Sequence, residues 1–421
     1  MIYMKRTELY SLTLMMAAIL LVPASCASEK NTQEMPSKHV ECPCDSISKS
    51  SFNASTEMAF SLFNTISSQS KQNENFMISP LSLNEILIML ANGATGNTQK
   101  QIRNAMGTGN QNPQKTSEIF SSLNEYLMSA DDGSTVTIAS SMWIDNKIKV
   151  KNDFIAKNQK YFDADTRNQA LATPKTMNDI NSWVENKTNG RIKRLISSTP
   201  SSDARMILVN TLYLNAKWED EFDKGLTKNE DFTNSDGTKS KVMMMHDRKE
   251  KDAYVGDKMD MARFHYLDGK YCMEIYLPHE GEDLDECQKD FNKKKTDMMR
   301  RSQLEYMMNI GMPRMELNCE KNLIPSLKAM GITDAFSNAA SFKGISDEKT
   351  YVSDILQKTY IKIDEEGTEA SAATKAEIAF LSMVKEKEPK PLDFIINRPF
   401  AYIIRENKSG TILFMGKVRK L

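Results

Sequence analysis

The 421-residue sequence predicts a mixed α+β protein with extensive antiparallel sheet, organised as one domain over residues 51–421. Three observations lead to this prediction. Segments with helical spacing and segments with strand alternation are mixed along the whole length without a βαβ rhythm. No polar linker interrupts the chain after residue 51, and 40% of the residues are hydrophobic, which suffices for a large core. The C-terminal region ends in strands that a short turn joins.

The predicted helices follow from apolar spacing and from start and stop signals. Residues 51–67 place Phe60 and Phe63 on one face. Ser79-Pro80 opens a second helix, and a glycine turn separates it from a third that reaches residue 106. The stretch MNDINSWVENKTNG predicts a helix that stops at Asn189-Gly190.

The predicted strands are apolar or alternating segments bounded by turn residues. The segment RMILVNTLYLNAKW is nearly all apolar, as expected of a strand covered on at least one face. Residues 392–407 and 410–418 are predicted as two strands that the turn Asn407 to Gly410 connects. The predicted strands are residues 135–144, 205–218, 270–278, 392–407 and 410–418.

The first 50 residues have the composition of a targeting segment and a tether. Residues 1–25 combine the basic start MIYMKR, the apolar run LTLMMAAILLV and a small-residue end, which predicts a signal peptide. Cys26 after Ala24-Ser25 resembles a bacterial lipobox, although Pro23 departs from its usual leucine; a plain signal peptide is the alternative. Residues 26–50 are polar and predict a flexible tether. We therefore expect export, either with a lipid anchor at Cys26 in a bacterial envelope or by secretion.

The overall composition argues against several functions. Lys plus Arg (55) balance Asp plus Glu (56), and no basic block appears, so we expect no nucleic-acid partner and no membrane contact besides the anchor. The 28 methionines are interpreted as core filler, with a Met-rich binding surface as the alternative. The sequence has four histidines, no GxSxG and no phosphate loop; HEGED at residues 279–283 is interpreted as a solvated loop. We expect neither an enzyme nor a cofactor.

Five cysteines remain after Cys26, at positions 42, 44, 272, 287 and 319. An odd number cannot form a complete set of disulfides within one chain. His39, Glu41, Cys42 and Cys44 lie together in HVECPC, but a metal site would need a partner cluster, so we predict none. Whether Cys42 and Cys44 pair with each other stays open.

The stretch IDEEGTEASAATKAEIAF at residues 363–380 poses a question, because a long run of small residues precedes bulky ones. Helix propensity favours a helix over about Glu369 to Phe380. Alternation favours a strand, since every second residue from Thr368 is uncharged while the other set carries three charges. The uncharged set is Thr368, Ala370, Ala372, Thr374, Ala376, Ile378 and Phe380. Its small side chains suit a strand that must enter between neighbours already in place.

Five segments, in order and over residues 51–421, together resemble the serpin family. They are NFMISPLSLNEILIMLANGATGNT, INSWVENKTNGRIKRLI, LVNTLYLNAKWEDEF, DEEGTEASAAT and FIINRPFAYIIRENKSGTILFMGKV. The resemblance implies a serpin fold with three β-sheets, eight to nine helices and an exposed reactive-centre loop at about residues 365–391. It implies a monomer that inhibits a serine protease, or a cysteine protease, by inserting its cleaved loop into the main sheet. A non-inhibitory binding or carrier serpin is the alternative.

The resemblance also implies site residues. The hinge would comprise Glu365, Gly367, Thr368, Ala370, Ala372 and Ala373. The shutter and breach regions, where the sheet opens, would contain Ser79, Ser82, Asn210, Trp218 and Gln357. Many serpins have a histidine where this chain has Gln357, and many have HPF where this chain has RPF with Arg398. Glutamine can still donate and accept hydrogen bonds, so the polar network could persist with a different pH dependence.

Counting about seventeen residues from Glu365 places the reactive bond at Leu381-Ser382. An apolar residue before the bond suits chymotrypsin-like or elastase-like enzymes, or papain-like ones. The loop is several residues longer than the family norm, so other registers are open. The alternates are Phe380 and Met383, and also Lys385 and Lys387, which would suit trypsin-like proteases.

Overall fold

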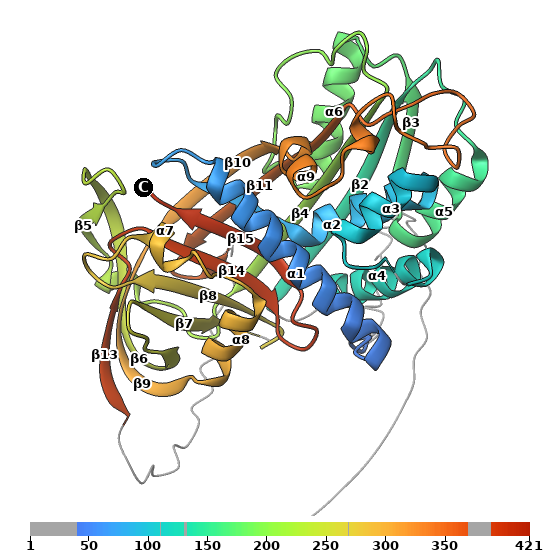
Figure 1. The fold of residues 1–421 in the computed structure, drawn as a ribbon. Coiled ribbons are helices and arrows are strands. Elements are labelled where there is room, and N and C mark those ends of the chain that lie inside the picture. Colours follow the sequence, from blue (N-terminus) through green and yellow to red (C-terminus); the bar gives the residue numbers. More distant parts are fainter. Residues whose placement is uncertain (1–39, 110, 130–132, 268, 369–388) are drawn as a thin grey trace, which may run out of the picture. The chain divides into compact units, whose positions relative to one another are not determined.

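The computed structural model describes residues 40–109, 111–129, 133–267, 269–368 and 389–421 (Figure 1). These residues form a mixed α+β fold, as predicted. Nine α-helices lie in the described part of the chain: α1 Ser46–Gln69, α2 Pro80–Gly93, α3 Gly96–Ala105, α4 Pro113–Met128, α5 Asn152–Phe162, α6 Pro174–Lys187, α7 Leu284–Cys287, α8 Lys293–Arg301 and α9 Ile324–Ala329. Two 3₁₀ helices are η1 Lys224–Leu226 and η2 Asp334–Phe336.

Hydrogen bonding joins the described strands into two sheets. The larger has the order β1-β15-β14-β8-β7-β6-β9-β13, with β5 paired to β6; the smaller has the order β10-β11-β12-β4-β2-β3. Three sheets were expected, but the long β6 pairs with β7 near its end and with β9 along its length, which joins two groups of strands into one sheet. The strands are β1 Phe76–Ile78, β2 Ser134–Asp145, β3 Asp165–Gln169, β4 Met206–Lys217, β5 Lys228–Thr233, β6 Lys239–Tyr254, β7 Met259–His265, β8 Tyr271–Pro278, β9 Leu304–Pro313, β10 Met315–Asn322, β11 Asp354–Asp364, β12 Gly367–Thr368, β13 Lys390–Ile395, β14 Phe400–Glu406 and β15 Ile412–Val418.

Strand β4 is buried on both faces, which explains its continuous apolar sequence. Leu208 and Leu212 join the main core with α2, a helix that contacts β2, β4 and β15. Ile207 and Val209 point to the other face, where they pack in a second cluster with Trp183 of α6. The six-stranded sheet is therefore covered by helices on both sides.

The helix predictions agree with the structure except at the N-terminal boundary. Ser79 caps α2, and the helix α6 ends at Lys187 before Asn189 and Gly190, both of which have positive φ. Helix α1 begins at Ser46, capped by Asp45, so the prediction of a flexible tether is wrong for residues 46–50. Sequence alone did not reveal this because that stretch is mostly polar.

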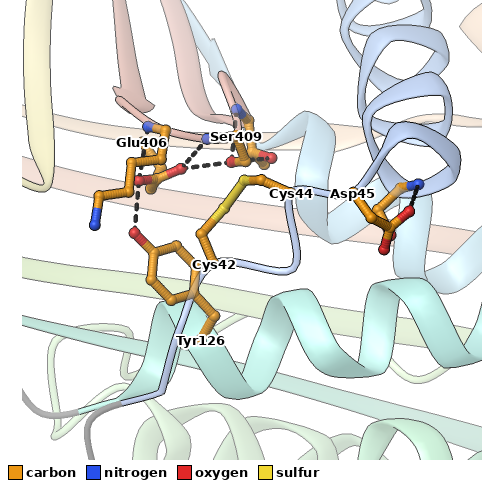
Figure 2. The surroundings of a disulfide bond; sticks show 9 residues. Cys42, Cys44, Asp45, Tyr126, Glu406 and Ser409 are labelled. Atoms are coloured by element: carbon orange, nitrogen blue, oxygen red, sulfur yellow. Dashed lines mark hydrogen bonds between the residues drawn. A yellow bond between two sulfur atoms is a disulfide. The ribbon is translucent and has the colours of Figure 1, made fainter.

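The segment that leads into α1 packs against the fold. Cys42 and Cys44 form a disulfide, which answers the question of their pairing, and both sulfurs are thereby unavailable as thiolate metal ligands. Val40 and Cys42 pack against the main core. Figure 2 shows the disulfide in the surroundings of Glu406 and Ser409, at the turn between β14 and β15.

The C-terminal segment predicted as one strand, residues 392–407, contains two. Strand β13 pairs in parallel with β9, whereas β14 pairs with β8 and β15. Arg398 lies in the bend between them and donates from Nε to the carbonyl of Pro278 at 2.7 Å. The hairpin of β14 and β15 is present as predicted. Among the described residues, no helix has the length and apolar character needed to cross a membrane.

Candidate functional site

At one end of the six-stranded sheet, β12 lies between β11 and β4 and separates them. At the other end, Asp354–Gln357 of β11 pairs in parallel with Ile207–Asn210 of β4. Farther along, Gly367 and Thr368 lie between the two strands and pair antiparallel with both. The sheet therefore holds two residues of the predicted hinge in a position between β11 and β4.

Gly367 fits this position because it has no side chain. Its φ is +151°, which L-residues rarely adopt. A Cβ at this position would overlap the carbonyl oxygen of Ala216 in β4. Glycine therefore fits this position without strain, whereas a residue with a side chain would not.

Thr368 is held by an aromatic pair beneath it. Its Oγ1 lies 2.6 Å from the hydroxyl of Tyr266, and its side chain is buried. Tyr266 stacks on Trp218 with ring centroids 4.6 Å apart. Trp218 in turn donates from Nε1 to the carbonyl of Asp364 at 3.0 Å. The predicted breach residue Trp218 and the predicted hinge residue Thr368 are thus brought together through Tyr266, which no local sequence pattern indicated.

Glu365 anchors the turn that leads into β12, and it is 2% exposed. Arg314 donates to its carboxylate from Nε at 2.9 Å and from Nη2 at 2.6 Å, and Thr227 donates at 2.5 Å. Burial by itself would raise the pKa of Glu365, but the hydrogen bonds from Arg314 and Thr227 outweigh it and lower the pKa. Arg314 and Thr227 are functional candidates that no local sequence pattern indicated.

We predict that Arg314→Ala weakens the fold at neutral pH, because it leaves a buried carboxylate without its charged partner. Since Arg314 is itself partly exposed, the expected loss in unfolding free energy is about 2 kcal/mol rather than the full value for a buried pair. A carboxyl with a lowered pKa stabilises above its unfolded pKa of about 4.3 and loses that contribution as pH falls through its folded pKa. The difference between wild type and variant in urea midpoint should therefore be full at pH 7 and shrink towards pH 3.

The control for this prediction is Arg194→Ala, which removes an exposed arginine elsewhere. A difference from wild type that stays constant from pH 7 to pH 3, or that the control reproduces, would contradict the role assigned to Arg314.

The predicted shutter residues meet at the start of α2, where all are buried. Gln357 accepts a hydrogen bond from Ser79 N and donates one to Ser79 O, both at 2.9 Å. Ser79 Oγ donates to Ser82 Oγ at 2.9 Å. Gln357 is also the register partner of Asn210 across β11 and β4. The amide thus uses both its donor and its acceptor, as the sequence analysis expected of a glutamine here.

Hydrogen bonds connect Asn210 through Ser140 to a buried acid, Glu85, which no local sequence pattern indicated. Asn210 Nδ2 donates to Ser140 Oγ at 2.7 Å, and Ser140 donates to the carboxyl group of Glu85 on α2. Asn124 on α4 donates to the same carboxyl group at 2.6 Å. Both partners of Glu85 are neutral, and burial, partly opposed by these two hydrogen bonds, raises its pKa to about 7.

We predict that Glu85→Gln removes a pH dependence of stability near neutrality. A carboxyl with a raised pKa keeps its proton in the folded state while the unfolded chain has lost it, so stability falls as pH rises from about 4.3 to about 7. The full effect is about 3.7 kcal/mol for this shift, and part of it is already present at pH 5. The stability of Glu85→Gln relative to wild type should therefore rise by about 2.5 kcal/mol between pH 5 and pH 8, measured as urea midpoints.

The control for this second prediction is Glu125→Gln, because Glu125 is an exposed carboxylate on the neighbouring helix α4. A relative stability of Glu85→Gln that does not change with pH would show that Glu85 is charged in the folded state at pH 5.

The remaining predicted site residues lie outside the described part of the chain. They are Ala370, Ala372, Ala373, Phe380, Leu381, Ser382, Met383, Lys385 and Lys387 of the loop, and also Cys26. The histidine of HEGED, His279, is half-buried, and its Nε2 lies 2.9 Å from Asp260 Oδ1. Within the described ranges, no group of three or more His, Cys, Asp and Glu side chains is arranged to hold a metal ion.

Comparison with known proteins supports the resemblance seen in the sequence. Human neuroserpin is 31% identical over 371 residues, which cover 82% of this chain and 86% of neuroserpin. A serpin-like protein of Methanosarcina acetivorans is 29% identical over 412 residues, covering 93% and 92%. The structure of human thyroxine-binding globulin complexed with thyroxine has a TM-score of 0.81 at 24% identity, covers 89% of this chain and 99% of that one, and shows the shared fold. The family model described as serpin (serine protease inhibitor) matches residues 53–421, and the chain therefore belongs to the serpin family.

Proposed function

We propose that this serpin inhibits proteases by acting as a suicide substrate whose cleaved loop inserts into the six-stranded sheet. The position of β12 carries the proposal. Gly367 and Thr368 already lie between β11 and β4, so the sheet accepts the first hinge residues as a strand. The sequence continues with small, uncharged residues at every second position, which supports further insertion into a packed interior.

In the proposed mechanism, a serine protease attacks the carbonyl carbon of Leu381. The peptide bond to Ser382 breaks, the new amino terminus at Ser382 takes a proton, and an ester joins Leu381 to the protease. Residues 369–381 then follow Gly367 and Thr368 into the space between β11 and β4, which must separate where they are paired. About 13 residues at ~3.3 Å each carry the attached protease ~43 Å, and deacylation fails because the protease's active site is distorted.

The test uses the protein from residue 27 onward, mixed with chymotrypsin-, elastase-, trypsin- and papain-type proteases. We expect a complex that survives denaturing electrophoresis. The mass of the released C-terminal peptide should be that of a peptide beginning at Ser382. A peptide that begins after Lys385 or Lys387 would support inhibition but shift the target to trypsin-like enzymes. Cleavage by every protease without any complex would refute inhibition and favour the alternative, a binding or carrier serpin.

The alternative has one observation in its favour, the fold similarity to a globulin that binds thyroxine. At 24% identity this likeness concerns the fold and leaves the ligand open. The small, uncharged set of residues after Gly367 favours the inhibitor instead, because a carrier has no need of an insertable loop.

We also propose that the protein is exported by a bacterium and anchored by a lipid on Cys26. The signal-like residues 1–25 and the lipobox-like position of Cys26 support this. Expression of the full chain in a bacterial host and mass spectrometry of its N-terminal peptide should find a lipid-modified Cys26. A soluble product that begins at another residue would support secretion and refute the anchor.

A further inference from the structure

A cavity of about 410 Å³ with strongly basic walls lies away from the hinge. It is formed by α1, β7, α8, β14 and the turn from β14 to β15. Asp297 is the one carboxylate among its lining residues in the described chain. Six cationic side chains line it: Lys49, Arg263, Arg300, Arg301, Arg405 and Lys408.

The innermost of these cations is Arg405, which is 3% exposed. Its Nε lies 3.1 Å from Oε1 of the fully buried Glu274, and Arg300 Nη1 lies 3.7 Å from the same oxygen. Tyr276 donates to the other oxygen of Glu274 at 2.7 Å. One buried carboxylate thus faces two guanidinium groups, and Arg405 Nη2 has no acceptor among the described residues.

The neighbouring groups do not balance this charge. Asp297 already pairs with Arg300 and, at 2.6 Å, with Lys293. Arg263 donates from Nη2 to Asn407 Oδ1 at 3.0 Å, while its Nε has no acceptor in the described structure. Burial and the nearby charge of Arg405 lower the pKa of Arg300, as expected where like charges gather. Buried donors without acceptors are unfavourable unless a ligand completes them.

We infer that this cavity binds a small, multiply charged anion of the phosphate type. Guanidinium groups present planar pairs of N–H donors that match the oxygens of a phosphate group. The side chains of Arg405 and Arg300 lie deep enough that the anion must enter the cavity to reach them, so the ligand is a free small molecule. None of the lining residues belongs to β4, β11 or β12, so the site is independent of the inhibitory mechanism.

The test is calorimetric titration of the protein from residue 27 onward with pyrophosphate and with inorganic phosphate at constant ionic strength. We expect saturable binding, tighter for pyrophosphate because it carries more charge. The variant Arg300→Gln with Lys408→Gln should weaken the affinity at least tenfold, since the anion loses charge-assisted hydrogen bonds to two cationic side chains. The matched control, Arg194→Gln with Lys147→Gln, removes the same charge from exposed positions elsewhere and should bind like wild type.

A second variant guards against misfolding of the first. Arg301 is exposed, and Arg301→Gln should keep the thermal stability of wild type while weakening pyrophosphate binding severalfold. The inference is overturned if pyrophosphate shows no saturable binding up to ~10 mM. It is equally overturned if the control pair loses as much affinity as the cavity variants, or if neither cavity variant changes the affinity. Protease trapping is not measured in this experiment, so its outcome does not depend on the proposed function.

Discussion

Replacing Thr368 with arginine should convert the inhibitor into a substrate. Thr368 is buried between β11 and β4 and its hydroxyl is hydrogen-bonded to that of Tyr266. An arginine would place an unpaired charge in that interior, which costs several kcal/mol or more in free energy. Insertion competes in time with hydrolysis of the acyl-enzyme, and each 1.4 kcal/mol added to its barrier slows it tenfold. We expect the fraction of protease recovered as a denaturant-resistant complex to fall at least tenfold, measured by gel densitometry.

The matched control for this variant is Glu369→Arg. Glu369 belongs to the charged set of the alternation, so an arginine there should leave trapping intact. Cleavage of the loop should proceed in both variants, since the predicted bond lies more than ten residues away. Undiminished trapping by Thr368→Arg, or equal loss in both variants, would contradict the proposal that this face of the loop enters the sheet.

Cleavage of the loop should raise the melting temperature by roughly 15 °C or more. An inserted strand would add about ten ladder hydrogen bonds, each with a net contribution of about 1 kcal/mol, and a gain of that size shifts melting by this amount in a large domain. A metalloprotease is the right reagent, because it forms no acyl-enzyme and so cannot be trapped. Scanning calorimetry of intact and cleaved protein measures the shift.

The same comparison in Thr368→Arg gives an internal control. Its cleaved form should melt close to its intact form, because the hinge cannot enter the sheet. A wild-type protein whose melting temperature hardly changes on cleavage would point to a serpin that does not insert its loop, and the binding or carrier function would then be favoured.

The sequence alone determined the features that depend on residues close together in the chain, namely periodic helices and strands and the residues that cap or connect them. Period-two alternation, helical spacing and capping residues are written in consecutive positions, so the helix cap at Ser79, the buried strand β4 and the hairpin of β14 and β15 were predicted from them. Gly367 was also expected in the hinge, because the segment DEEGTEASAAT resembles the serpin hinge. The start of α1 at Ser46 was missed because a mostly polar stretch gives no periodic signal.

The tertiary structure alone decided which distant side chains meet. Arg314 reaches Glu365 across 51 positions and Tyr266 reaches Thr368 across 102. These pairs depend on which strands are neighbours in a sheet and on their register, and no local pattern encodes either. The same holds for Glu85, whose raised pKa follows from its burial against α4 and β2. It also holds for the basic cavity between α1, α8 and β14, where elements far apart in sequence concentrate positive charge. Local periodicity is a property of the chain, whereas burial and pairing are properties of the assembled fold.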